Sequence, residues 1–171
     1  MQTTRRPATG SALLLFRRTL TARTPATRTQ LLLLLRHGAH GAGTWGAPGG
    51  KPEAGETPIM AACRETREET GLPLAPDDLH TGPVTDDAFP GGPYFRTHCF
   101  AAACPPDAVP RIQEKDKMRD LAWFDTRELP EPLFLPVINL SRQMAESDDT
   151  LDAMAHRLFR ADTNRPVTRP R

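Results

Sequence analysis

The chain has 171 residues and a formal net charge of +1, a length suited to one domain with a hydrophobic core and a charge that argues against a dedicated nucleic-acid surface. It carries three cysteines, an odd number without close pairing, which favours a reducing compartment, the cytoplasm, over a disulfide scaffold. Its apolar runs are shorter than the roughly 18 to 20 residues that span a membrane, so no membrane partner is expected.

The first part of the chain is basic, because residues 1–52 contain seven arginines and Lys51 but no acidic residue. An arginine- and threonine-rich segment without acids is also typical of an organellar transit peptide, and that alternative stays open. The apolar runs at 11–16 and 31–35 are better explained as two core strands, the second buried on both faces. We expect residues 17–30 to form a long hairpin loop between them.

A glycine-rich loop, PGGKPEAGE at residues 48–56, leads into a predicted helix. Thr57 suits the N-cap and Pro58 the first helical position, because the missing N–H of proline costs nothing there. Gly71 stands where a left-handed residue ends a helix. Helical spacing gathers a small, mostly apolar stripe on one side of this helix, suited to packing: Ile59, Ala62, Cys63, Thr66 and Thr70.

Three carboxylates share another face of the same helix. Glu65, Glu68 and Glu69 stand at i, i+3 and i+4, a spacing at which like charges destabilise a helix. Helical geometry points Arg64 and Arg67 elsewhere, so that they offset the repulsion only in part. A solvated acidic face is the simplest explanation of such a cluster.

The loop before the helix favours a metal site instead. Its tight turn brings backbone carbonyls and either Glu53 or Glu56 towards the same helix, which makes an oxygen-rich pocket. Carboxylates, a carbonyl and positions open to water are what Mg²⁺ or Mn²⁺ requires, and such ions are usually shared with substrate phosphates.

These residues carry a resemblance to the Nudix family. The segment Gly50-x5-Glu56-x7-Arg64-Glu65-Thr66-x-Glu68-Glu69-x-Gly71-Leu72 resembles the Nudix box, G-x5-E-x7-R-E-U-x-E-E-x-G-U, with Thr66 at an aliphatic position as the single departure. The resemblance implies an α/β fold, the Nudix α/β/α sandwich with a mixed β-sheet. It also implies that Glu65, Glu68, Glu69 and the Gly50 carbonyl hold the metal, and that Arg64 braces Glu56 and Glu65.

A second resemblance lies downstream. Residues 122–136, AWFDTRELPEPLFLP, resemble the C-terminal segment of the Nudix enzymes that hydrolyse nucleoside triphosphates and dihydroneopterin triphosphate. Those enzymes carry E-P-E-K before it, and the stretch 114–117, EKDK, stands at the matching distance. The resemblance suggests an acid of this stretch, Asp116 in first place and Glu114 in second, as the general base or an extra metal ligand. A solvated charge run is the alternative for both Glu114 and Asp116, and Glu65 is then left as the base.

Several residues are candidates to bind substrate. Arg36 and Lys51 are placed to touch phosphate, although a strand-end arginine and a solvated lysine explain them equally well. Trp45, Phe89 and Tyr94 are candidates to stack on a ring, with ordinary core aromatics as the alternative. Three histidines are better explained as ordinary loop or strand residues: His37, His40 and His98.

The remaining elements complete a coarse map. Strands are expected at 78–89, 94–104 and 121–125, a charged loop at 111–119, and helices at 133–146 and 151–160. These elements form a single domain at 11–160, flanked by disordered tails at 1–10 and 161–171.

The predicted function is that of a Mg²⁺- or Mn²⁺-dependent hydrolase. It cleaves the pyrophosphate linkage of a nucleoside diphosphate linked to another group, most simply a (modified) nucleoside triphosphate to the monophosphate and pyrophosphate. A hydrolase of nucleotide sugars or of a pathway-specific diphosphate is the alternative within catalysis, and a non-catalytic nucleotide sensor is the alternative outside it. The expected partner is a small-molecule nucleotide or another diphosphate substrate, with a homodimer left open.

Overall fold

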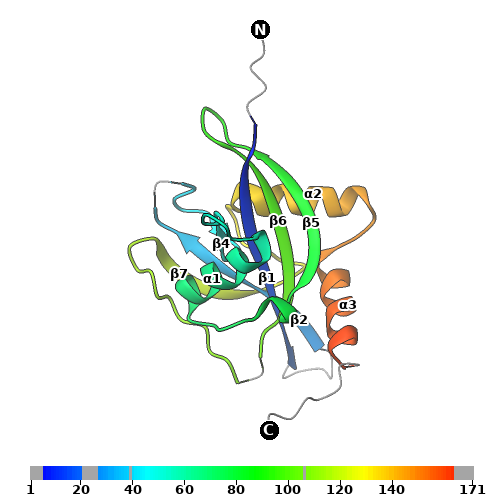
Figure 1. Ribbon diagram of the computed structural model, residues 1–171. Helices are drawn as coiled ribbons and strands as arrows, with labels where there is room; N and C mark the ends of the chain where they lie inside the picture. The colour runs from blue at the N-terminus through cyan, green and yellow to red at the C-terminus, as the bar shows by residue number, and fades with distance from the viewer. Residues whose placement is uncertain (1–5, 21–26, 39, 106, 164–171) are drawn as a thin grey trace.

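The computed structural model describes residues 6–20, 27–38, 40–105 and 107–163. A mixed sheet lies between helices on its two sides (Figure 1). The strands are β1 (Ala8–Leu20), β2 (Thr27–Arg36), β3 (Trp45–Gly46), β4 (Gly49–Gly50), β5 (His80–Ala88), β6 (Tyr94–Ala103) and β7 (Met118–Asp125). The helices are α1 (Pro58–Thr70), the 3₁₀ turn η1 (Pro76–Asp78), α2 (Leu135–Glu146) and α3 (Leu151–Thr163).

The sheet follows the order β3-β2-β1-β6-β5, with β4 added against β1 and β7 against β2. The long strands β1 and β6 run parallel, and every other pairing is antiparallel. The parallel register sets Gly10 opposite Thr97 and Ala12 opposite Cys99. The predicted α/β fold with a mixed sheet is therefore confirmed.

The two central strands separate near one end of the sheet. β2 pairs with β1 only over Thr27–Leu31, and farther along it pairs with β3 through Leu34 and Leu35. The other end of β1 pairs instead with β4, through Ser11 and Ala12. The short segment that carries β3 and β4 thus fills the space where β1 and β2 part.

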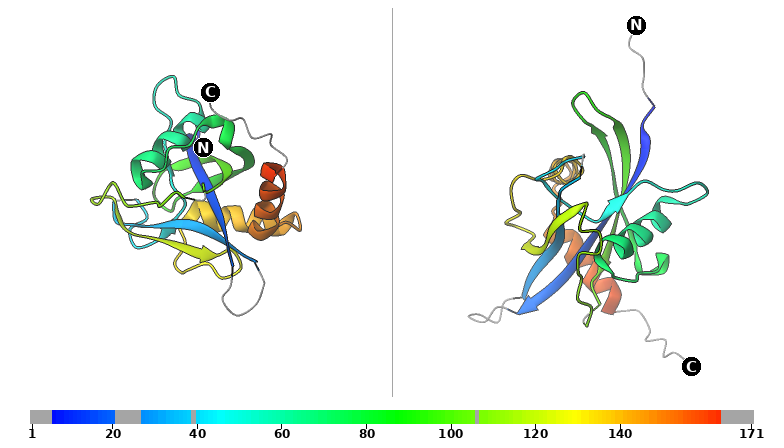
Figure 2. Two further views of the ribbon diagram at one scale, coloured as in Figure 1. Left: turned by 90° about the horizontal axis from the view of Figure 1, so that it is seen from below. Right: turned by 90° about the vertical axis from the view of Figure 1, so that its left-hand side faces the viewer.

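Each side of the sheet packs against its own helices (Figure 2). Because side chains alternate along a strand, β1 sends Leu14 and Phe16 towards α2 and α3, and Leu13 and Leu15 towards α1. Four leucines of β2, residues 31–34, are at most 1% exposed, which confirms the strand predicted to be buried on both faces. The two apolar clusters are the two interfaces of the sandwich.

Helix α1 begins and ends as its sequence predicts. The Thr57 side chain accepts a hydrogen bond from the Met60 backbone N–H at 3.4 Å, and Pro58 opens the helix. Gly71 ends it with φ of 75°, the left-handed conformation that glycine adopts without strain. Most of the predicted small stripe is buried against β1 and β6, and the buried residues of the helix are Ala61, Ala62, Cys63, Thr66, Glu69 and Thr70.

The first hairpin differs from its prediction. The strands continue through most of the segment expected to be a loop, because β1 extends to Leu20 and β2 begins at Thr27. Two arginines of this segment lie on aromatic rings, with Arg17 4.4 Å from the centre of the Trp123 ring and Arg18 4.3 Å from that of Phe159. Cation–π contacts of this kind let arginine-rich chain remain in the sheet.

Both predicted tails are shorter than expected. β1 begins at Ala8, so residues 8–10 are strand, and α3 continues to Thr163 beyond the predicted boundary at 160. Residues 6–7 are described and have no regular secondary structure. Tail residues 1–5 and 164–171 and hairpin residues 21–26 lie outside the described part of the chain. The other elements match their predicted places to within about two residues at most boundaries.

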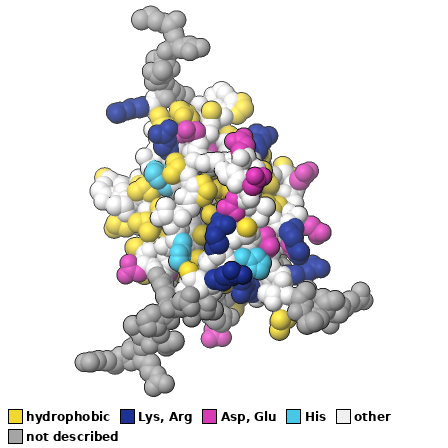
Figure 3. All heavy atoms as spheres, turned by 90° about the vertical axis from the view of Figure 1, so that its right-hand side faces the viewer, with side chains coloured by type: hydrophobic (Ala, Val, Ile, Leu, Met, Phe, Trp, Pro, Cys, Tyr) yellow, Lys and Arg dark blue, Asp and Glu magenta, His cyan; other side chains and the backbone are white. Residues whose placement is uncertain are grey.

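The surface that carries α3 and β5 has mixed charge. Basic and acidic side chains are interspersed on this face (Figure 3). Ion pairs that involve these two elements include Arg157 with Asp149 and Arg96 with Asp86. This distribution agrees with the small net charge of the sequence. Among the described residues, no helix is long and apolar enough to cross a membrane.

The two buried threonines of α1 give a matched test of its packing. The Thr66 hydroxyl is fully buried without a hydrogen-bond partner, whereas the Thr70 hydroxyl donates to the Thr66 carbonyl at 2.6 Å and accepts from the Leu72 N–H. We expect Thr66→Val to leave the free energy of unfolding unchanged or raise it, and Thr70→Val to lower it by about 1 to 2 kcal/mol. Urea unfolding of both variants is the measurement, and equal losses would contradict this account.

Candidate active site

One guanidinium group organises the loop that precedes α1. Arg64 donates through Nε and Nη2 to the carboxylate of Glu56 at 3.0 Å, and through Nη2 to the Lys51 carbonyl at 3.0 Å. Through Nη1 it donates to Glu65 at 2.9 Å and to Glu68 at 3.0 Å. The bond to Glu56 is the main cause that raises the pKa of Arg64 and lowers the pKa of Glu56. Arg64 therefore ties the loop to the first two acids of the helix.

This arrangement corrects one expectation and agrees with another. Helical geometry alone pointed Arg64 away from the acids, but the side chain folds back onto Glu65 and Glu68. The family resemblance implied that Arg64 braces Glu56 and Glu65, and Arg64 forms ion pairs with both. Glu53 stays on the exposed side of the loop, and its backbone N–H donates to Glu56.

The last acid of the cluster, Glu69, points inward instead of sharing an open face with Glu65 and Glu68. It is 3% exposed and accepts a hydrogen bond from the Gly49 N–H at 3.0 Å. Burial raises the pKa of Glu69 to about 8, and the neighbouring carboxylates of Glu65 and Glu114 contribute in the same direction. A single backbone N–H does not offset that desolvation.

The two glycines of β4 make room for the cluster. A Cβ atom at Gly49 would lie 2.2 Å from the Ser11 carbonyl oxygen, so only glycine lets this strand pair so closely with β1. A Cβ atom at Gly50 would lie 2.2 Å from the Glu65 carboxylate. Burial raises the pKa of Glu65, against the opposing effect of Arg64. The loop and the helix therefore enclose Glu65 as closely as backbone allows.

A fourth carboxylate completes this region. The loop after β6 is anchored to the end of α1, because the Gln113 N–H donates to the Glu69 carbonyl at 3.0 Å and the Arg111 N–H donates to the Thr70 carbonyl at 2.8 Å. This anchoring brings Glu114 near Glu69. One Glu114 oxygen accepts from Lys117 at 2.7 Å, and the other is buried without a hydrogen-bond partner.

Asp116, the acid that the resemblance selected in this loop, lies elsewhere. It is exposed within the turn at residues 115–117, whereas Glu114 contributes to the raised pKa of Glu69. Both acids belong to the stretch that matches E-P-E-K, and the structure brings the first of them to the cluster.

The donors of this region suit a hard cation. Across the four described ranges of the chain, no group of three or more His, Cys, Asp and Glu side chains is arranged to hold a metal ion. Arg64 forms ion pairs with Glu65 and Glu68 in this arrangement. The donor set consists of carboxylate and carbonyl oxygens, which Mg²⁺ and Mn²⁺ prefer. The desolvated Glu69 and the unpartnered oxygen of Glu114 both gain from a nearby positive charge. The chemistry of the residues thus fits a divalent ion.

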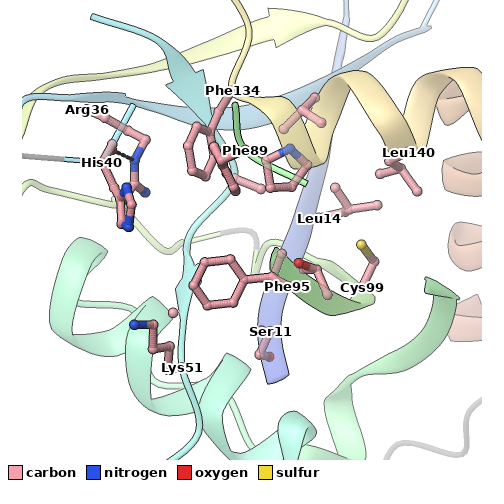
Figure 4. Close-up of a pocket in the computed structure, with 18 residues that line it drawn as sticks. Ser11, Leu14, Arg36, His40, Lys51, Phe89, Phe95, Cys99, Phe134 and Leu140 are labelled. Atoms are coloured by element: carbon pink, nitrogen blue, oxygen red, sulfur yellow. Dashed lines mark hydrogen bonds between the residues drawn. The ribbon is translucent and has the colours of Figure 1, made fainter. Parts of the chain in front are cut away.

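A pocket opens beside β4, on the side of the sheet that faces α2 (Figure 4). Its volume is about 780 Å³, which includes space open to solvent at the mouth of the pocket. In Figure 4 the cationic Arg36 and Lys51 lie at one end with His40, and Leu14, Leu140 and Cys99 lie at the other end. The rings of Phe89, Phe95 and Phe134 lie between the two ends. The pocket is therefore apolar inside and cationic at the end towards β4.

The two cations are held by aromatic rings. The guanidinium of Arg36 lies 4.4 Å from the centre of the Phe134 ring and donates through Nε to the His40 carbonyl at 3.0 Å. The Lys51 ammonium lies 5.1 Å from the centre of the Phe95 ring. Burial lowers the pKa of Arg36, and Glu69 and Glu65 oppose that shift. Arg36 therefore lies between the pocket and the carboxylates.

Of the three residues predicted to stack on a ring, one lines the pocket and two do not. Phe89 lines the pocket, where its ring centre is 5.4 Å from that of Phe134. Trp45 packs into the core instead, edge-to-face with Phe124 at 4.8 Å, so its alternative explanation as a core aromatic is the one observed. Tyr94 starts β6 and is not part of the pocket lining. His40, which the sequence favoured as an ordinary loop residue, is part of the lining.

Sequence reasoning missed other lining residues. Phe95 and Phe134 belong to segments recognised as strand and helix start, but no sequence signal distinguished them from core aromatics. Thr97 and Cys99 lie on the pocket floor because the parallel pairing of β6 with β1 places them beside Gly10 and Ala12.

Comparison with known proteins identifies the family. The family model for the NUDIX domain matches residues 13–144. The chain belongs to the NUDIX domain family.

Its relatives include curated proteins and a solved structure. It is 34% identical over 102 residues to an oxidized purine nucleoside triphosphate hydrolase of Danio rerio, covering 59% of this chain and 62% of that protein. It is 34% identical over 89 residues to a nucleoside triphosphate pyrophosphatase/Nudix hydrolase fusion protein of Bifidobacterium longum, covering 52% of this chain and 17% of that protein. The matches therefore span less than two thirds of either curated relative.

The fold agrees with a crystal structure of a MutT NUDIX hydrolase from Burkholderia pseudomallei. The TM-score is 0.65 at 29% identity, over 79% of this chain and 96% of the other. The resemblance stated from the box residues is thereby confirmed at the level of family and fold.

The buried Glu69 makes stability depend on pH in metal-free protein. Burial raises the pKa of Glu69 from 4.5 to about 8. Between these two pH values the folded protein keeps a proton on Glu69 that the unfolded chain releases. That stability is fully present below pH 4.5 and is lost as the pH rises through about 8. In EDTA, we expect the unfolding temperature of wild type to fall between pH 6 and pH 9 by more than that of Glu69→Gln. If the unfolding temperature changes equally with pH in wild type and in Glu69→Gln, Glu69 is not desolvated.

Proposed function

We propose that the chain is a Mg²⁺- or Mn²⁺-dependent hydrolase that cleaves the pyrophosphate linkage of a nucleoside diphosphate linked to another group. The preferred substrate class is a (modified) nucleoside triphosphate, released as the monophosphate and pyrophosphate. The observation that carries the proposal is the continuity of an aromatic pocket, two cations and a carboxylate cluster along β4.

The pocket supports a nucleotide orientation. A base fits among Phe89, Phe95 and Phe134, where an aromatic ring gains from stacking. Arg36 and Lys51 stand at the end of the pocket that leads to Gly50, so they would bind the phosphates. The reacting phosphorus then lies beside the carboxylates of α1. The names of the curated relatives, which refer to nucleoside triphosphates, agree with this substrate class.

The carboxylates supply the chemistry. Glu65, Glu68, Glu69 and the Gly50 carbonyl would hold the divalent ion, as the family resemblance implies. When bound, the ion neutralises phosphate charge and stabilises the charge that develops on the transferred phosphoryl group. Arg64 fixes the rotamers of Glu65 and Glu68 through its ion pairs with both carboxylates.

A base must accept a proton from the attacking water. As the water oxygen bonds to phosphorus, the bridging P–O bond breaks, pyrophosphate leaves and the water proton passes to a carboxylate. We transfer this role from Asp116 to Glu114, because Glu114 has a buried oxygen without a partner and lies near Glu69. Glu65 is the alternative base.

The setting of the enzyme is part of the proposal. The cysteines Cys63, Cys99 and Cys104 are all free thiols, which supports the cytoplasm as its location. We propose a small-molecule nucleotide as the partner, without a role for nucleic acid or a membrane, and leave a homodimer open.

A nucleotide panel tests the proposed function. With millimolar Mg²⁺ we expect hydrolysis of at least one nucleoside triphosphate with release of pyrophosphate, and loss of turnover in excess EDTA. Glu68→Gln should reduce kcat by about 100-fold or more, since it removes a charge from the ion's ligands. Glu146→Gln, an exposed acid at the end of α2, is the matched control and should match wild type. Full activity in EDTA, or normal turnover of Glu68→Gln, would refute the proposal.

The base is tested by two acids of one loop. Glu114→Gln should lower kcat by about 100-fold with a smaller change in KM, because proton transfer belongs to the transition state. Asp116→Asn should leave both constants close to wild type, since this side chain is exposed. Steady-state kinetics measure both. The reverse pattern would return the role to Asp116, and two normal variants would leave Glu65 as the base.

A further inference from the structure

A buried polar network lies against the inner wall of the pocket and is not used in hydrolysis. Asp87 on β5 is 0% exposed. Its Oδ2 accepts hydrogen bonds from the Thr97 hydroxyl at 2.5 Å and the Thr85 hydroxyl at 3.1 Å, and its Oδ1 accepts from Asn139 Nδ2 at 2.8 Å. The network therefore joins β5, β6 and α2 beside a pocket whose interior is otherwise apolar.

The network decides what Thr97 can offer a ligand. A hydroxyl has one hydrogen and two lone pairs, and the hydrogen of Thr97 is donated to Asp87. Thr97 lines the pocket, so the capacity that remains for a ligand is that of an acceptor. The other polar side chain on this floor is Cys99, whose pKa burial raises to about 12, and which therefore stays a neutral thiol.

The neighbouring residue leaves this acceptor accessible. Gly10 stands opposite Thr97 in the parallel register, and a Cβ atom there would lie 2.9 Å from the Thr97 hydroxyl oxygen. Any other residue at position 10 would therefore crowd that oxygen. A small residue also follows on the same face of β1, where Ala12 stands opposite Cys99.

We propose that Thr97, oriented by Asp87, is a specificity-determining residue that selects a ring presenting an N–H or amino hydrogen to the pocket floor. This inference rests on the proposed function, in which the pocket holds the base. In an apolar pocket, a ring that offers a hydrogen pairs with the oxygen. A ring that offers a lone pair at the same place leaves both acceptors unpaired and loses affinity.

Binding of product monophosphates tests the proposal without turnover. The members of each of two pairs differ in a hydrogen-bond donor. The first pair is dAMP, with its amino group, against the deoxynucleotide of unsubstituted purine. The second pair is 8-oxo-dGMP against dGMP; 8-oxo-dGMP has a ring N–H in place of the N7 lone pair and a carbonyl in place of the C8–H. Calorimetry should give wild type an affinity for the donor-bearing member of at least one pair that is about 10-fold higher. Thr97→Val should reduce that preference to about 2-fold or less, and Thr97→Ser should keep it.

Thr85→Val is the matched control. Thr85 donates to the same oxygen of Asp87 and is buried, but it does not line the pocket, so its loss weakens the network without removing the pocket acceptor. We expect Thr85→Val to retain the preference, with a lowered unfolding temperature. Gly10→Ala is a second probe, which leaves Asp87 unchanged and should also reduce the preference by crowding the Thr97 oxygen.

The outcomes separate this inference from the proposed function. Absence of a preference in wild type, an unchanged preference in Thr97→Val, or equal loss in Thr85→Val would overturn the role of Thr97. If Thr97→Val does not fold, an unchanged preference in Gly10→Ala would overturn the role of Thr97 instead. Hydrolysis of triphosphates together with any of these results leaves the proposed function intact. Selective binding without hydrolysis would support the role of Thr97 and refute the proposed hydrolase function. If no monophosphate binds, the assignment of this pocket to the base is refuted, and the role of Thr97 with it.

Discussion

The guanidinium of Arg64 is the constraint on which the site depends. It donates hydrogen bonds to Glu56, to the Lys51 carbonyl, to Glu65 and to Glu68, so one side chain fixes a loop and a helix face together. A planar group with five donors can satisfy these acceptors at once, whereas a lysine offers a single point of charge. Because Lys51 is tied to α1 in this way, Gly50 stays against Glu65, and the cationic end of the pocket stays next to the acids.

The carboxylates remain under electrostatic strain despite this bracing. Glu69 has one backbone donor and is desolvated, and Glu114 keeps a buried oxygen without a partner. Such groups cost stability unless a cation or a proton accompanies them. Arg36 and Lys117 contribute positive charge from a distance, since both interact with Glu65 and Glu69. The fold thus holds negative charge in a place where a nearby cation would relieve both repulsion and desolvation.

Local signals in the sequence were sufficient for α1 and its loop. Thr57, Pro58 and Gly71 mark the helix ends by rules that involve only near neighbours, and the box fixed the family. The path of Arg64 was not available from helical spacing, because a long side chain can turn back over its own helix to reach acids one and four residues away. The length of β1 was missed because Arg17 and Arg18 look like loop residues until Trp123 and Phe159 are placed beneath them.

The pocket residues could not be predicted because they depend on pairing between distant strands. Trp45 and Phe134 lie on neighbouring segments, yet Trp45 packs on Phe124 while Phe134 turns to the pocket. No local pattern separates the two. The hydrogen bonds of Asp87 to Thr97 and Asn139 likewise join residues 10 and 52 positions apart.

The pocket exists because one face of β1 changes size along its length. Towards α2, the strand presents Gly10 and Ala12 before Leu14 and Phe16, which belong to the core. Large residues at the first two positions would fill the pocket, just as Leu14 and Phe16 fill the core beyond it. The Ser11 hydroxyl, between Gly10 and Ala12, donates a hydrogen bond to the Pro58 carbonyl at the start of α1. Alternation along a single strand therefore places the start of the acidic helix on one side of the sheet and the aromatic pocket on the other, with β4 between them.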